Sequence, residues 1–436
     1  MFWITSVIFS LTYLGLAIGR VPGLRMDRAA IAFVGATLML VAGVLTIQQA
    51  VAPDSIDYET LFLLFGMMVV VGCLRISGVF AHLTNWSLGR IRTPRAMLAM
   101  TILLAGVLSA FLVNDIVCLA ITPLVIHLAR RLRFDPLPHL VGVATAANIG
   151  SAGTITGNPQ NMIIGIQSRI PYLRFAAHLL PLAAIGLVVD FLIVAWVYRH
   201  ALVVVPDDDA RTAHAAASPD DRVPNAAHAA VSASPTNFSR QRNSIIWLQR
   251  KSVVVTLASV AMFFAGFQIA LVAICAAAVL LIAPIKSKRI YDQIDWSLLL
   301  MFIGLFIVVH AFQDRVVATW GIDQWRQLLA HPIGELSVAA AALSNLVSNV
   351  PAVLLFEPIM HAIPEAARQN AWLALAMSST FAGNLTVLGS VANLIVIESA
   401  RREGVAISFT EYCKVGIPVT IATLALGIAW LEFLTC

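Results

Sequence analysis

Residues 144–165 read ATAANIGSAGTITGNPQNMIIG, a stretch that is long enough to cross a bilayer but carries many small polar side chains. Pro159 cannot donate a backbone hydrogen bond, and it disfavours helical angles at the preceding residue, Asn158. We therefore predict a break at Gly157-Asn158-Pro159 between two half-helices. Freed backbone groups are tolerated at membrane depth only inside protein or beside a wet cavity, so the break is a candidate binding site. The alternative is a proline kink lined with small residues for helix packing.

A second copy of this pattern lies in the other half of the chain, where residues 378–397 read SSTFAGNLTVLGSVANLIVI. The polar and glycine positions of the first copy recur 232 residues later: Thr154, Gly157 and Asn161 match Thr386, Gly389 and Asn393. The recurrence indicates an internal duplication, which is common in transporter folds.

The composition places the chain among polytopic membrane proteins. It has 436 residues, of which 59% are hydrophobic and 12% charged, and its mean hydropathy is +0.87. Residues 1–18 are interpreted as a first span and not as a cleaved signal peptide. The net charge of +5 is assigned to membrane orientation and not to nucleic-acid binding. The five cysteines are scattered singly, which predicts neither a disulfide framework nor a metal site, and no cofactor is expected.

Two apolar stretches are too long for single spans. As one helix, residues 96–129 would extend about 50 Å, whereas a hydrocarbon core is about 30 Å thick. Basic residues flank this stretch on both sides, so we predict a re-entrant hairpin with its tip at Val113-Asn114-Asp115. Residues 335–363 repeat the design, with a tip at Ser348-Asn349-Val350-Pro351.

Each half is therefore predicted to contain three spans, a hairpin, a broken span (138–168 or 371–399) and a final span, giving about ten crossings plus two hairpins in an all-α protein. Five crossings per half is an odd number, so the second half is inverted. We divide the chain into an N-terminal repeat (1–203), a disordered cytoplasmic linker (204–246) and a C-terminal repeat (247–436). With the N-terminus outside the plasma (inner) membrane, cytoplasmic loops hold 23 of the 28 Lys and Arg residues.

Inverted repeats with broken helices place substrate near the bilayer midplane, where small polar side chains and half-helix ends can hold an ion. The candidate substrate- or ion-binding residues of both halves are Asn114, Asp115, Thr154, Gly157, Asn158, Asn161, Ser348, Asn349, Thr386, Gly389, Ser390 and Asn393.

Each of three side chains has two possible roles. A carboxylate at Asp115, deep between two apolar limbs, either contacts substrate or a coupling ion, or caps the second limb of its hairpin. The Cys118 thiol, one turn further on, either contacts a metalloid or acts as a small buried apolar group. Asp190 is either a proton relay or a member of a buried pair.

At these residues the chain resembles the ion transporter superfamily, in the branch of arsenite permeases, citrate-transporter-like permeases and sodium/proton antiporters. The motifs that carry the resemblance are Val113-Asn114-Asp115 with Thr122-Pro123, Gly157-Asn158-Pro159-Gln160-Asn161, Ser348-Asn349-Val350-Pro351 and Gly389-Ser390-Val391-Ala392-Asn393. The resemblance implies a scaffold, a moving transport domain, and coupling to a proton or sodium gradient.

The expected function is secondary active transport of a small anion, with an arsenite- or antimonite-type oxyanion or its neutral hydroxide favoured. A sodium/proton antiporter, a citrate or dicarboxylate permease and a passive channel are the alternatives. Enzyme motifs of the His-Glu-x-x-His, Gly-x-Gly-Asp and Gly-x-Ser-x-Gly types are absent. No Gly-x4-Gly-Lys-Ser/Thr loop is present either, so ATP could act only through a separate ATPase subunit. The expected partners are a small ion and the lipid bilayer, and a homodimer stays open.

Overall fold

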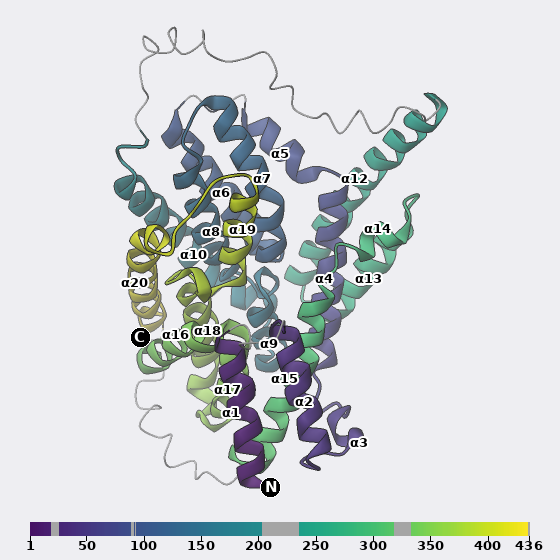
Figure 1. Cartoon of the computed structure of the whole chain (residues 1–436), viewed down its shortest axis with the longest axis vertical. Coiled ribbons are helices and arrows are strands. Elements are labelled where there is room, and N and C mark those ends of the chain that lie inside the picture. The colour runs from purple at the N-terminus through teal and green to yellow at the C-terminus, as the bar shows by residue number, and fades with distance from the viewer. Residues whose placement is uncertain (19–25, 89–90, 92, 203–234, 318–332, 435–436) are drawn as a thin grey trace.

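The computed structural model describes residues 1–18, 26–88, 91, 93–202, 235–317 and 333–434, and every regular element in these ranges is a helix (Figure 1). Six of the helices are long and apolar enough to cross a membrane: α4, α6, α10, α12, α15 and α20. Shorter apolar helices and two interrupted helices accompany them. The predicted fold class, an all-α polytopic membrane protein, is confirmed.

The N-terminal repeat runs from α1 to α10. Its elements are α1 (Phe2–Ile18), α2 (Arg28–Val41), α3 (Ile47–Ala50), α4 (Tyr58–Ile76), α5 (Val79–Leu88), α6 (Pro94–Phe111), α7 (Asn114–Leu132), α8 (Pro136–Ser151), the 3-10 turn η1 (Ile155–Gly157), α9 (Pro159–Ser168) and α10 (Tyr172–Val197).

The C-terminal repeat has the same order of long elements. They are α12 (Pro235–Phe264), α13 (Ile269–Leu281), α14 (Ser287–Tyr291), α15 (Trp296–Arg315), α16 (Gly334–Val347), α17 (Asn349–Ala362), α18 (Glu365–Ala382), the 3-10 turn η5 (Val387–Gly389), α19 (Val391–Arg402) and α20 (Phe409–Phe433).

The linker prediction needs one correction. Residues 204–246 were expected to be disordered, but residues 235–246 form the first turns of α12. Pro235 stands at the start of this helix, where its fixed φ suits the first turn and its missing amide hydrogen is not needed. Residues 203–234 lie outside the described ranges.

Reciprocal helix crossings relate the two repeats. Helix α2 packs against α15, and α4 packs against α13. Both crossings are close at a glycine: a methyl group added at Gly66 would lie 2.6 Å from the Ala273 backbone, and one added at Gly304 would lie 2.7 Å from the Ala32 backbone. The matching contacts are expected if a two-fold axis relates the halves. In Figure 1, α4, α12 and α13 lie beside one another, to the right of the bundle that contains α6, α8 and α10.

Each helical hairpin ends against the interrupted helix of its own repeat. Helices α6 and α7 are separated by Leu112 and Val113, and the Thr154 hydroxyl donates to the carbonyl of Ala110 near this tip. At the second tip, the Asn345 side chain donates to the carbonyl of Ala382 at 3.0 Å. The tips therefore stop at the depth of the two breaks, as a re-entrant hairpin requires.

Candidate functional site

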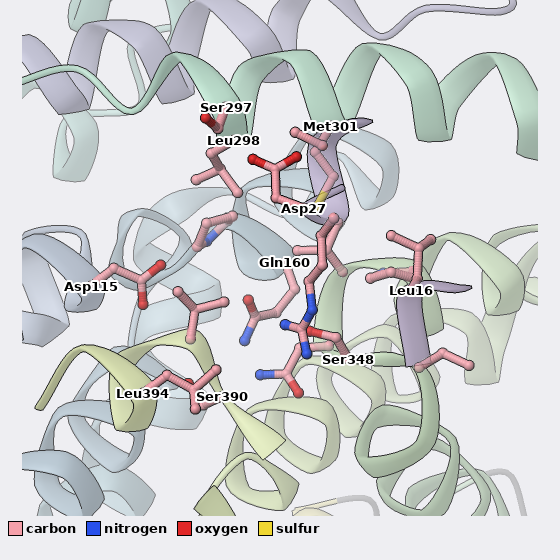
Figure 2. Close-up of a pocket in the computed structure, with 18 of the residues that line it drawn as sticks. Leu16, Asp27, Asp115, Gln160, Ser297, Leu298, Met301, Ser348, Ser390 and Leu394 are labelled. Atoms are coloured by element: carbon pink, nitrogen blue, oxygen red, sulfur yellow. The ribbon is translucent and has the colours of Figure 1, made fainter. Parts of the chain in front are cut away.

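Four helices point their N-terminal ends at one cavity of about 470 Å³. The cavity is lined by the first residues of α7, α9, α17 and α19, which are Asn114, Pro159, Asn349 and Val391. Two of these helices follow hairpin tips and two follow helix breaks. Figure 2 shows Asp115, Gln160, Ser348 and Ser390 facing Asp27 and Ser297 across this space. Its volume lies in the range of small-molecule sites.

Local capping explains why both helices restart beyond their breaks. The Asn158 side chain accepts a hydrogen bond from the Asn161 amide at 2.8 Å and so caps α9. In the second repeat, the Ser390 hydroxyl accepts from the Ala392 amide at 3.2 Å and caps α19. Both capping residues have extended backbone angles. The second break therefore forms without the proline that marks the first.

Two asparagine side chains donate hydrogen bonds to the backbone carbonyl groups at the breaks. Asn161 donates to the carbonyls of Thr154 at 3.0 Å and Ser151 at 3.1 Å. Its counterpart Asn393 donates to the carbonyls of Thr386 at 3.0 Å and Gly383 at 2.7 Å. All four partners obey the 232-residue offset seen in the sequence. These side chains satisfy backbone groups that would otherwise be unpaired and buried.

Asn148 joins the first hairpin tip to the second break. It accepts from the Asn114 side chain at 3.2 Å and from the Ser390 hydroxyl at 3.0 Å. It also donates to the side-chain oxygens of Asn384 at 2.8 Å and Asn393 at 3.0 Å. Asn148 is 1% exposed, so this network replaces water completely at its side chain.

Thr380 lies 232 residues after Asn148 and connects to the first break in the corresponding way. Its hydroxyl accepts from Asn158 at 3.2 Å and from Gln160 at 3.3 Å. With its amide turned so that the nitrogen faces two carbonyls, Asn349 donates to Ser379 at 3.1 Å and Gly389 at 3.2 Å. The two repeats therefore share one continuous polar network beneath the cavity.

Charged side chains line the cavity on both sides. The described lining residues include three carboxylates, Asp27, Asp115 and Asp295, and one guanidinium, Arg28. Asp27 caps α2 by accepting from the Ala30 amide at 2.8 Å, and Asp295 caps α15 in the same way. Within the described part of the chain, neither the Asp115 carboxylate nor the Arg28 guanidinium has a hydrogen-bond partner. Both are available to a ligand.

The predicted site residues fall into two groups. Those that line the cavity are Asn114, Asp115, Ser348, Asn349 and Ser390. Those that build the breaks beneath it are Thr154, Gly157, Asn158, Asn161, Thr386, Gly389 and Asn393. Cys118 and Asp190 are each 0% exposed and belong to neither group.

The predicted set omits several residues of the site. Asp27, Arg28 and Asp295 stand at the starts of α2 and α15, outside the hairpins and broken spans in which the site was predicted. Gln160 and Asn148 stand within the polar stretch of residues 144–165, but they have no identical partner 232 residues later. The repeat signal therefore passes over them.

The comparisons with known proteins agree on a class. A family described as "Citrate transporter" matches residues 7–381 and 321–434. The chain is 32% identical to the silicon efflux transporter LSI3 of Oryza sativa subsp. japonica, over 97% of this chain and 96% of that protein. It is 25% identical to the putative transporter arsB of Dictyostelium discoideum, over 98% and 90% of the two chains.

A solved structure shares the fold. The crystal structure of the Alcanivorax borkumensis YdaH transporter, described as having an unusual topology, aligns with a TM-score of 0.52 and 15% identity. The alignment covers 99% of this chain and 96% of that one. At this identity the likeness concerns the fold alone.

Proposed function

The chain belongs to the citrate transporter family, and from this premise we propose that it is a secondary active transporter whose substrate is a small hydroxylated acid of the arsenite, antimonite or silicic acid type. That it is an integral, multi-pass membrane transporter and not an enzyme follows from its family and its helices. To this transporter class, the proposal adds the identity of the substrate and coupling to an ion gradient.

The observation that carries the substrate proposal is the charge balance of the cavity. The described lining holds three carboxylates and one guanidinium. Six helix N-termini reach the cavity, those of α2, α7, α9, α15, α17 and α19, and each adds about half a positive charge, so the sum lies within about one charge of zero. A neutral polyhydroxy acid suits this balance, since its hydroxyls can donate to Asp115 and accept from Arg28 or from the amide of Gln160. That a relative is named a silicon efflux transporter supports the same chemistry.

Two alternatives are tested beside it. The partnerless Asp115 carboxylate would also suit a sodium ion, as a sodium/proton antiporter requires. Citrate would bring three carboxylates into a cavity with a single described guanidinium, Arg28. Electrostatic repulsion from the three aspartates makes that ligand the least favoured of the three.

The test is uptake into proteoliposomes that contain the purified protein, under an imposed proton or sodium gradient. Arsenite, antimonite, silicic acid, citrate and sodium are offered separately. We expect one of the first three to accumulate above its equilibrium level. Accumulation of citrate or sodium alone would contradict the substrate proposal. Uptake of arsenite that stops at equilibrium under every gradient would instead indicate a passive channel.

We predict that Asp115→Asn abolishes this uptake while the protein still inserts and purifies normally. The substitution removes the acceptor charge that faces the ligand but keeps the size of the side chain. The matched control is Asp314→Asn, because Asp314 is half-exposed and pairs with its neighbour Arg315 at 3.2 Å. Wild-type flux through Asp115→Asn would remove Asp115 from the site.

A further inference from the structure

A second buried carboxylate lies away from the cavity. Asp190, on α10, is 0% exposed, and neither of its oxygens has a hydrogen-bond partner in the described part of the chain. The polar side chain beside it is Thr145 of α8, whose hydroxyl donates to the Val141 carbonyl at 3.0 Å. An ionised carboxylate without a partner is strongly disfavoured in such a place, so it is stable there only when it carries a proton.

Tyr412, on α20, is a buried hydroxyl group near that carboxylate. Its ring is 0% exposed, its hydroxyl has no partner among the described residues, and it lies within electrostatic reach of Asp190. Cys118 of α7 lies within reach of the same tyrosine. Cys118 in turn stands one turn after Asp115, whose carboxylate lines the cavity. Asp190, Tyr412 and Cys118 are therefore buried titratable groups on three different helices, and Cys118 lies close to the substrate site.

A second connection runs through hydrogen bonds. The Asn384 side chain donates to the carbonyl of Thr145 at 3.2 Å and accepts from Asn148 at 2.8 Å. Asn148 also holds Asn114 at the first hairpin tip. A shift of Thr145 when Asp190 changes its charge is thus passed to the residues beneath the cavity.

We propose that Asp190 is the proton-binding site of this transporter and that one proton is exchanged there in each transport cycle. The carboxylate takes a proton from water on one side of the membrane, remains neutral while it is sealed between α8, α10 and α20, and releases the proton to water on the other side. This inference rests on the proposed function, since it names the ion that drives it.

The surroundings of Asp190 hold no competing charge in the described residues. Helices α6, α8, α12, α18 and α20 pack against α10. From these, Thr145 of α8 and Tyr412 of α20 lie near the carboxylate, and neither carries a charge at neutral pH. His139 of α8 is also buried without a partner, but it stands nearly two turns before Thr145. Among the described residues, no charged side chain lies near the carboxylate. A bound proton is therefore what neutralises it.

The experiment compares wild type with Asp190→Asn, which is neutral and similar in size, in proteoliposomes. Two modes are measured: accumulation of arsenite driven by a proton gradient, and exchange of labelled for unlabelled arsenite without a gradient. We expect Asp190→Asn to lose gradient-driven accumulation and substrate-dependent proton movement, but to keep exchange. Accumulation at the wild-type level, with its usual proton movement, would overturn the inference.

Infrared titration of the purified protein gives a readout that does not depend on transport. We expect the C=O band of a protonated carboxyl in wild type and its loss in Asp190→Asn, with Asp314→Asn as the control that keeps the band. An unchanged band in Asp190→Asn would also overturn the inference. If wild type transports no arsenite, antimonite or silicic acid, the substrate proposal fails, while the infrared result still decides whether Asp190 holds a proton.

Discussion

At the scale of single residues, Asn148 connects more of the site than any one cavity-lining group. It meets the first hairpin tip through Asn114 and the second break through Ser390, Asn384 and Asn393. Because each amide atom is engaged, a change at this position leaves buried partners without hydrogen bonds. Each such group costs about 1–3 kcal/mol.

We therefore predict that Asn148→Ala lowers the midpoint of thermal unfolding and weakens arsenite binding about tenfold, the equivalent of about 1.4 kcal/mol. Thermal unfolding of the detergent-purified protein, with and without ligand, measures both effects. Gln369→Ala is the control, because the Gln369 side chain is partly exposed and its hydrogen bond among the described residues is the one that it accepts from Arg174 at 3.1 Å. Equal behaviour of the two variants would contradict the role of Asn148.

The sequence predicts part of this site well. Repetition at a fixed offset identifies Asn161 and Asn393, which the structure places in equivalent hydrogen bonds. Arg28 and Asp295 were not among the predicted site residues, since they stand at the starts of α2 and α15, far from both breaks in the chain. Only the tertiary arrangement of those helices brings their charges to the cavity. Side chains contributed by tertiary packing leave no local pattern.

At the scale of helices, the breaks depend on close backbone approach. A methyl group added at Gly157 would overlap the Ser151 carbonyl, so the 3-10 turn must move to accept it. At Gly389 the nearest atom is the Gly383 carbonyl oxygen at 2.9 Å, which is less tight. The two breaks are alike in hydrogen bonding but differ in how much space they leave.

We predict that Gly157→Ala reduces transport and thermal stability more than Gly389→Ala does. Gly334→Ala is the control, because its added methyl group would lie 3.6 Å from the nearest atom, an ordinary contact. Initial uptake rates and unfolding midpoints provide the measurement. If Gly157→Ala behaves like Gly334→Ala, the tight packing at the first break has no functional consequence.

The sequence is less informative where a helix has no strong breaker. The first break follows from Pro159, whereas the second is formed by the Ser390 cap and would be missed without the repeat. Conversely, the low hydropathy of residues 235–246 suggested disorder, yet they extend α12. Apolar patterning reports burial, so it does not identify a helix whose residues lack an apolar face.

At the scale of the whole molecule, contacts between the repeats join helix ends that the topology assigns to one side. Arg130 and Glu403 form an ion pair at 3.4 Å, and both lie in predicted cytoplasmic loops. Arg174 donates to Gln369 at 3.1 Å, and both lie in regions predicted to be outside. The orientation of the termini stays a prediction from the distribution of Lys and Arg.

Single cysteines test that orientation. In a variant without the five native cysteines, Glu403→Cys and Gln369→Cys are labelled with a membrane-impermeant maleimide in intact cells. We predict that the reagent labels position 369 from outside and reaches position 403 only after the membrane is opened. The reverse pattern would show that the chain is inserted the other way round.

The most direct test of the central claim is the position of the substrate between the two repeats. Crystals soaked in arsenite and measured near the arsenic absorption edge would locate the ligand by anomalous scattering. We predict an arsenic peak inside the cavity, between the N-terminal ends of α7 and α17 and beside Asp115. A peak elsewhere in the protein, or none there at saturating arsenite, would contradict it.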